Sequence, residues 1–91
     1  MKLDITKRVL KDLERLDAKQ FKQVGLAIFR LLKEPEPHDG ASLKGTARGE
    51  RRIDVGEYRV IYAVHDETLE VLVFGKRNDD AVYRMWERLQ P

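Results

Sequence analysis

Apolar residues recur with two different periods along the chain, and each change of period marks the end of one predicted element and the start of the next. Residues 2–5 alternate, with Leu3 and Ile5 on one side, which predicts a short strand. Between residues 7 and 34, apolar residues instead recur every three or four positions, the spacing that places them on one face of a helix. The chain is therefore predicted to begin with a strand that is followed by helices.

Residues 6–34 are predicted to form two helices joined by a very short turn. Thr6 and Asp17 each carry a side-chain oxygen that suits an N-cap, so we expect one helix over 7–16 and a second after Asp17. The second helix must end before Pro35, because the residue before a proline is pushed out of the helical region. The apolar stripes are Val9, Leu10, Leu13 and Leu16 in the first helix and Phe21, Val24, Ile28, Leu31 and Leu32 in the second, with Leu26 and Phe29 widening it.

Residues 34–50, EPEPHDGASLKGTARGE, have the composition of a loop. The segment holds two prolines and three glycines, and Leu43 is its one large apolar residue. A loop of 17 residues is long for a compact domain, and such loops are often functional. A functional segment and a plain connector are both open at this point.

Three strands joined by short turns are predicted after this loop. The first alternates, whereas the second is apolar without alternation, which indicates that both its faces are covered. Gly56 favours a tight turn between them, because glycine adopts positive φ without steric cost. Residues 65–68 turn the chain again, so the strands form an antiparallel meander. They are RRIDV (51–55), YRVIYAV (58–64) and LEVLVFG (69–75).

A last helix is predicted after Asn78 or Asp79, either of which suits an N-cap. Its apolar stripe is formed by Val82, Met85, Trp86 and Leu89. The predicted fold class is α+β in a single domain, 1–91: an N-terminal strand, a helical hairpin, a three-stranded antiparallel meander and a C-terminal helix. We expect the hairpin on one face of the sheet and the last helix on the other side or edge.

The composition excludes several classes of protein and several kinds of binding site. Hydrophobic residues make up 42% and charged residues 37% of the 91 residues, as in a globular chain rather than a disordered one. Cysteine is absent, the two histidines share no ligand spacing, and the glycines match no phosphate-binding loop, so we expect neither a metal site nor a cofactor. We see no signal peptide and no apolar stretch near the ~20 residues of a membrane span, and we expect a cytoplasmic protein. The net charge of +2 permits a nucleic-acid partner without demanding one.

Arg59 stands directly in front of the most apolar run of the chain. It either reaches water along its stem near a turn or lines a binding site. Arg52, Arg77 and Tyr83 lie on or beside the neighbouring elements, and each taken singly has a structural explanation. Together, arginines in a partly dry groove suit a phosphate, whose oxygens match the guanidinium fork. A tyrosine beside them can stack on a base or transfer a proton.

Several stretches of the sequence carry a resemblance to a known family. They are LKG (43–45), RRIDVGEYRVIY (51–62) and FGKRNDDAVY (74–83), and the specific part is GEYRVIY followed by GKR and a later tyrosine. From Leu43 to Leu89 the chain resembles the RelE/ParE superfamily of toxins from toxin–antitoxin pairs, and the RelE branch more closely. The resemblance implies a RelE-like fold, which is similar to that of the microbial ribonucleases.

The resemblance also implies an activity: a type II toxin that enters the ribosomal A site and cleaves mRNA there without a metal. In this family the 2′-hydroxyl attacks the adjacent phosphate and leaves a 2′,3′-cyclic phosphate end. By the same resemblance, Arg59 steadies the charged transition state and Arg77 assists the leaving 5′-oxygen. Tyr83 stacks on a nucleotide or acts as the base. The residues implied to bind RNA are Arg51, Arg52, Lys44 and Lys76.

Asp54 departs from the family pattern, which has a second basic residue at this position. A carboxylate facing the phosphate repels it, and the repulsion grows in a dry site. Asp54 could instead pair with Arg52 or Arg59 and hold the guanidinium in place, or serve as a base. The efficiency of cleavage is therefore open, whereas the expected fold is unaffected.

The register between the second and third strands of the meander decides whether Arg77 joins Arg59. A two-residue loop at 66–67 pairs Arg59 with Phe74 and sends Arg77 to the opposite face. A three-residue loop, or a bulge near Gly75, brings Arg77 to the same face. The nuclease hypothesis requires one of the last two arrangements.

Two other functions are weighed beside the nuclease. The ParE branch acts on DNA gyrase, and Asp54 and the weak net charge favour that alternative. A catalytically decayed toxin would only bind its antitoxin. The nuclease, the gyrase inhibitor and the decayed toxin all imply a cognate antitoxin and a toxin–antitoxin hetero-oligomer. We expect the antitoxin segment to be acidic or amphipathic and to bind at the strand edges or in the groove between the hairpin and the meander.

Overall fold

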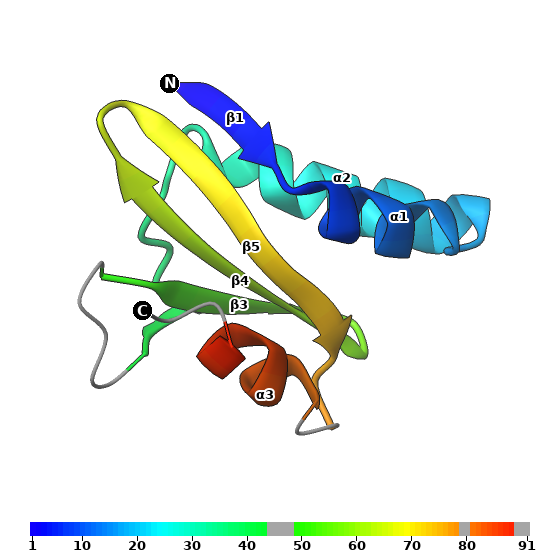
Figure 1. Ribbon diagram of the computed structural model, residues 1–91. Coiled ribbons are helices and arrows are strands. Elements are labelled where there is room, and N and C mark those ends of the chain that lie inside the picture. The colour runs from blue at the N-terminus through cyan, green and yellow to red at the C-terminus, as the bar shows by residue number, and fades with distance from the viewer. Residues whose placement is uncertain (44–48, 79–80, 89–91) are drawn as a thin grey trace.

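The computed structural model describes residues 1–43, 49–78 and 81–88. In chain order its elements are β1 (Lys2–Ile5), α1 (Lys7–Glu14), α2 (Ala18–Leu31), β2 (Ala41–Ser42), β3 (Arg51–Val55), β4 (Tyr58–His65), β5 (Thr68–Lys76) and α3 (Ala81–Arg88). The strands form one sheet in the order β1-β5-β4-β3-β2. The α1–α2 hairpin covers one face and α3 lies against the other (Figure 1), so the predicted α+β class is confirmed.

The helical hairpin begins where its capping side chains predict. Thr6 Oγ1 accepts a hydrogen bond from the Val9 amide at 3.3 Å, and Asp17 Oδ1 accepts one from the Gln20 amide at 2.8 Å. Both predicted N-caps are therefore confirmed. α2 ends at Leu31, before the proline that was expected to stop it.

β4 is buried on both faces, as its unbroken apolar run predicts. Val60 and Tyr62 pack toward the hairpin, whereas Ile61 packs toward α3, and all three are 0% exposed. The buried residues on the hairpin face are Val9, Leu13, Val24, Ile28, Leu31, Ile53, Val55, Val60, Tyr62, Leu69, Val71 and Phe74. Those on the α3 face are Ile61, Val73 and Val82, with Trp86 and Met85 partly buried beside them.

The turn between β4 and β5 is the two-residue loop, formed by Asp66 and Glu67 with φ angles of 49° and 61°. On its own, this loop would send Arg77 to the opposite face from Arg59. β5, however, carries an extra residue, Leu72, in a bulge that shifts every later pair by one position.

The bulge decides which side chains share the α3 face. Beyond it, Arg59 lies opposite Gly75, and Arg77 follows Gly75 on the same face. A bulge near Gly75 was one of the two arrangements left open by the sequence, and the bulge lies at Leu72. The register that the nuclease hypothesis requires is nevertheless present.

One short strand was not predicted, and the partner of the predicted N-terminal strand was not specified by the sequence. Residues 34–50 were predicted to be a loop, but Ala41 and Ser42 form β2 at the edge of the sheet, because two residues are too few to show a period. β1 pairs in parallel with β5, a long-range partner that local alternation does not specify. The N-cap predicted at Asp79 and the stripe residue Leu89 lie outside the described residues. No helix in the described part of the chain is long and apolar enough to cross a membrane.

Candidate functional site

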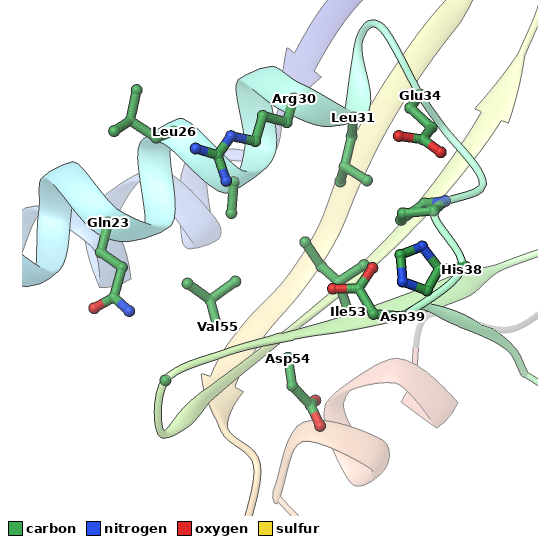
Figure 2. A pocket seen from close by; sticks show the side chains of 13 residues that line it. Gln23, Leu26, Arg30, Leu31, Glu34, His38, Asp39, Ile53, Asp54 and Val55 are labelled. Carbon is green, nitrogen blue, oxygen red and sulfur yellow. The ribbon is translucent and has the colours of Figure 1, made fainter.

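Strand alternation separates the charged side chains of β3 from its core residues. Ile53 and Val55 pack toward the hairpin, so Arg52 and Asp54 face α3, and Asp54 lies directly opposite Arg59 of β4. Figure 2 shows the Asp54 side chain pointing from β3 toward α3, to the opposite side of the strand from Ile53 and Val55. Arg52, Asp54 and Arg59 therefore form a charged site on the α3 face of the sheet.

Arg59 and Asp54 form a two-point ion pair. Arg59 Nε donates to Asp54 Oδ1 at 2.6 Å, and Arg59 Nη2 donates to Oδ2 at 3.1 Å. The Arg59 side chain is only 14% exposed, so the pair is partly shielded from water. The hydrogen bond to Asp54 is the main cause that raises the pKa of Arg59, against the opposing effect of burial.

Tyr83 brings α3 to the same guanidinium. Arg59 Nη1 donates to the Tyr83 hydroxyl, and Arg59 Cζ lies 5.5 Å from the centroid of the Tyr83 ring, within the range of a cation–π contact. α3 is held there because Val82 is buried against Ile61 and Val73 of the sheet. The Tyr83 phenol and the Arg59 guanidinium therefore hold each other in place.

Arg52 and Arg77 approach the same carboxylate from two sides. Their Nη1 atoms lie 3.8 Å and 3.9 Å from Asp54 Oδ2, and their side chains are 33% and 48% exposed. The Arg77 amide donates to the Glu57 carbonyl at 2.9 Å, which ties the chain after β5 to the β3–β4 turn. Both arginines can thus reach a ligand from solvent. We call Arg52, Asp54, Arg59, Arg77 and Tyr83 the arginine cluster.

The arginines keep Asp54 ionised. The hydrogen bond from Arg59 is the largest cause that lowers the pKa of Asp54; partial burial opposes it, and the positive charges of Arg59, Arg52 and Arg77 reinforce it. Three cations and one anion leave the arginine cluster with a net charge of +2. Asp54 therefore pairs with arginine, one of the alternatives raised by the sequence.

The sequence profile described as "ParE toxin of type II toxin-antitoxin system, parDE" matches residues 3–81 of the chain. The chain belongs to this toxin family. A comparison with curated proteins gives no match.

Solved structures place the toxin in the RelE-like branch of the RelE/ParE superfamily. It is similar to a chain of the archaeal RelE–RelB complex from Pyrococcus horikoshii OT3, with 30% identity and a TM-score of 0.75 over 84% of this chain and 93% of that one. It is also similar to the free form of an E. coli RelE mutant, with 26% identity and a TM-score of 0.78 over 98% and 97%.

A third similar structure is a chain of the RelBE2 complex from Mycobacterium tuberculosis, with 26% identity and a TM-score of 0.70 over 84% of the toxin and 96% of that chain. The family profile carries the ParE name, whereas these structures are RelE proteins. The two names belong to branches of one superfamily. The family match alone therefore does not distinguish an mRNA target from a gyrase target, and the residues of the site must do so.

Two of the residues that were predicted to bind RNA, Arg51 and Lys76, do not join the arginine cluster in this toxin. Strand alternation places Arg51 and Lys76 on the hairpin face, and Arg51 Nη1 donates to Ser42 Oγ at 2.9 Å. Lys44 lies outside the described residues. Of the described members of that set, Arg52 alone lies in the arginine cluster, because a neighbour in sequence occupies the opposite face of a strand.

Sequence reasoning missed Glu50, which precedes β3 and is 0% exposed. Trp86 Nε1 of α3 donates to Glu50 Oε2 at 3.0 Å. This hydrogen bond ties α3, and with it Tyr83, to the beginning of β3. One carboxylate at the end of a polar loop carries no signal of burial, so the contact could not be read from the sequence.

Proposed function

We propose that this toxin is a ribosome-dependent, metal-independent mRNA endonuclease that arrests translation in the cytoplasm. The observation that carries the proposal is that Arg59, Arg77 and Tyr83 converge on one face of the sheet. Arg59 is hydrogen-bonded to Tyr83, and both arginines contact Asp54. These are the residue types that the resemblance to the RelE branch assigns to cleavage.

In the proposed reaction the mRNA 2′-oxygen bonds to the adjacent phosphorus, and the bond from phosphorus to the 5′-oxygen breaks. The proton that leaves the 2′-hydroxyl is balanced by one that reaches the 5′-oxygen, so the products are a 2′,3′-cyclic phosphate and a 5′-hydroxyl. Negative charge grows on the phosphate oxygens, and a positioned guanidinium stabilises it. Arg59 takes this role, and Arg77 donates a hydrogen bond to the leaving oxygen. Tyr83 stacks on a nucleotide or accepts the 2′ proton.

The proposal is tested by expressing the toxin without an antitoxin and mapping mRNA 5′ ends by primer extension. We expect arrest of growth and translation, together with new ends inside translated regions. Arg59→Ala, produced at the same level, is the control and should give neither. Arrested cells without new mRNA ends would contradict the proposal.

A gyrase inhibitor is the second candidate, because the matching family profile carries the ParE name and Asp54 places a negative charge among the arginines. This candidate predicts DNA-damage signalling and gyrase–DNA adducts. Unchanged supercoiling activity in the presence of excess toxin would remove it. A decayed toxin, in contrast, would form a complex with its antitoxin and never arrest growth.

A cognate antitoxin in a hetero-oligomer is the proposed partner. Solved structures similar to this toxin come from RelE–RelB complexes of P. horikoshii and E. coli. α2 exposes Phe21, Leu26 and Phe29, and a groove of about 460 Å³ lies beside it, between α2, the 34–39 segment and β3 (Figure 2). The groove is lined by apolar residues such as Leu26 and Leu31 and by Arg30 beside Glu34 and Asp39. Of the two kinds of segment expected from the sequence, acidic or amphipathic, the amphipathic one therefore suits this surface better.

A further inference from the structure

One carboxylate oxygen lies at the centre of the arginine cluster. Asp54 Oδ2 is 3.1 Å from Arg59 Nη2, 3.8 Å from Arg52 Nη1 and 3.9 Å from Arg77 Nη1. The three guanidinium groups come from β3, from β4 and from the chain after β5. The position of this oxygen is therefore the point to which the cations of the site converge.

A fold-stabilising ion pair needs only one cation, so stability does not explain three. Arg52 and Arg77 are also partly exposed, and such pairs add little to stability because water screens them. Three guanidinium groups around one point repel one another unless an anion lies between them. Guanidinium forks bind a carboxylate and a phosphate in the same bidentate manner.

We propose that the Asp54 carboxylate occupies the phosphate position of the arginine cluster, and that an RNA phosphate binds by displacing it. This inference rests on the proposed function, which supplies the RNA, and it assigns Asp54 the role of setting how tightly the site holds a phosphate. Asp54 competes with the ligand as an anion tethered to the same strand.

The geometry allows the exchange. The Asp54 side chain is 30% exposed, so it can rotate into solvent without opening the core. Its departure frees the Nε–Nη2 edge of Arg59, while the Nη1 contact to Tyr83 is independent of Asp54. The incoming phosphate then meets an arginine that is already oriented.

The alternative role for Asp54 is that of a general base. A base works best when its pKa is near the working pH. Hydrogen bonding to Arg59 instead lowers the pKa of Asp54 from its ordinary value of 3.8, which makes the carboxylate a weaker base. The contacts therefore favour an anion held in a binding site over a group that accepts a proton.

Titration of the purified toxin with sulfate, followed by NMR, tests the proposal. Sulfate is used because its charge is constant near neutral pH. We expect Asp54→Asn to bind sulfate about tenfold more tightly than the wild type, and Asp54→Ser to behave in the same way. Asp66→Asn removes an equal charge from the distant β4–β5 turn, where asparagine tolerates positive φ, and should bind like the wild type.

Equal or weaker sulfate binding by the folded Asp54→Asn and Asp54→Ser variants would overturn the proposal. An equal gain in Asp66→Asn would also overturn it, because the effect would then come from net charge alone. The mRNA cleavage assay is read separately. Tighter sulfate binding without any cleavage would refute the proposed function but keep Asp54 as the group that occupies an anion site. Cleavage with unchanged sulfate binding would keep the proposed function and refute this role of Asp54.

Discussion

At the scale of single residues, Asp54 meets its arginine partners only when the sheet forms. Arg59 lies five residues away in sequence and Arg77 more than twenty, yet both contact the Asp54 carboxylate in the folded protein. In the unfolded chain these groups are solvated and apart. Asp54 therefore binds a proton less readily in the folded state, which links stability to pH.

The first prediction concerns acid unfolding of Asp54→Asn. The pKa of Asp54 is lowered by folding, so its ion pairs stabilise the fold above the ordinary value of 3.8 and are lost as the pH falls through the folded pKa. Urea unfolding should show a difference of about 1 kcal/mol or less between wild type and Asp54→Asn at neutral pH. That difference in the free energy of unfolding should shrink as the pH falls below 3.8. A difference that widens in acid would contradict this prediction.

The second prediction concerns the Tyr83 hydroxyl. Tyr83→Phe keeps the ring but removes the acceptor of the Arg59 Nη1 hydrogen bond. We expect mRNA cleavage to slow by ~10² or more, the range for loss of an acid–base group, while the urea midpoint stays close to that of the wild type. A cleavage rate equal to that of the wild type would assign Tyr83 to stacking alone.

At the scale of elements, the site depends on how closely α3 approaches the sheet. A Cβ on Gly75 would lie 2.6 Å from Val82 Cγ2, so only glycine lets α3 pack at this distance. Gly75 is also the residue opposite Arg59, and Val82 directly precedes Tyr83. The packing that seats the helix therefore also sets the contact between Arg59 and Tyr83.

Gly75→Ala is the third prediction. The added methyl group must displace Val82, a buried and stiff β-branched residue, so we expect a loss of about 1–3 kcal/mol in the free energy of unfolding. Cleavage should fall even where the variant is fully folded, because Tyr83 moves with α3. Gly25→Ala is the matched control: nothing lies near its Cβ, and alanine should stabilise α2 by up to ~1 kcal/mol. Wild-type stability of Gly75→Ala would show that α3 is not tightly packed.

Local patterns predicted most elements because each pattern is set within a few residues. The N-caps at Thr6 and Asp17 and the two-sided burial of β4 follow from such patterns, and the structure has them. A bulge in β5 could only be offered as an alternative, and near Gly75 rather than at Leu72, because the sequence around Leu72 is as apolar as that of an unbulged strand. That one inserted residue brings Arg77 to the face of the sheet that carries Arg59.

At the scale of the whole molecule, the two faces of the sheet carry different chemistry. The arginine cluster lies on the α3 face, whereas the exposed apolar side chains of α2 lie on the hairpin. The layers were predicted from the sequence, but the parallel β1–β5 pair was not, because its partner lies more than sixty residues away. The face of Arg51 and Lys76 likewise depends on register and not on their neighbours in sequence.

The fourth prediction separates these two faces. Leu26→Ser combined with Phe29→Ser removes two exposed apolar side chains beside the groove, where we propose that the antitoxin docks. We expect the toxin to remain active but to bind its antitoxin at least ~10-fold more weakly, since apolar anchors carry much of the affinity of such interfaces. Val64→Ser, at the exposed end of β4, is the control and should be neutralised normally. Full neutralisation of the double variant would move the antitoxin site elsewhere.

The central claim is that Arg59 acts on RNA phosphate, and the direct measurement is the cleavage rate of mRNA on programmed ribosomes by purified Arg59→Ala. Loss of one positioned cationic donor should lower the rate by ~10²–10³. The urea midpoint should stay near that of the wild type, because Arg59 lies in the site and Asp54 retains Arg52 and Arg77 nearby. If Arg59→Ala instead unfolds the protein, while Arg77→Ala and Tyr83→Phe cleave at the wild-type rate, Arg59 is structural and the nuclease assignment fails.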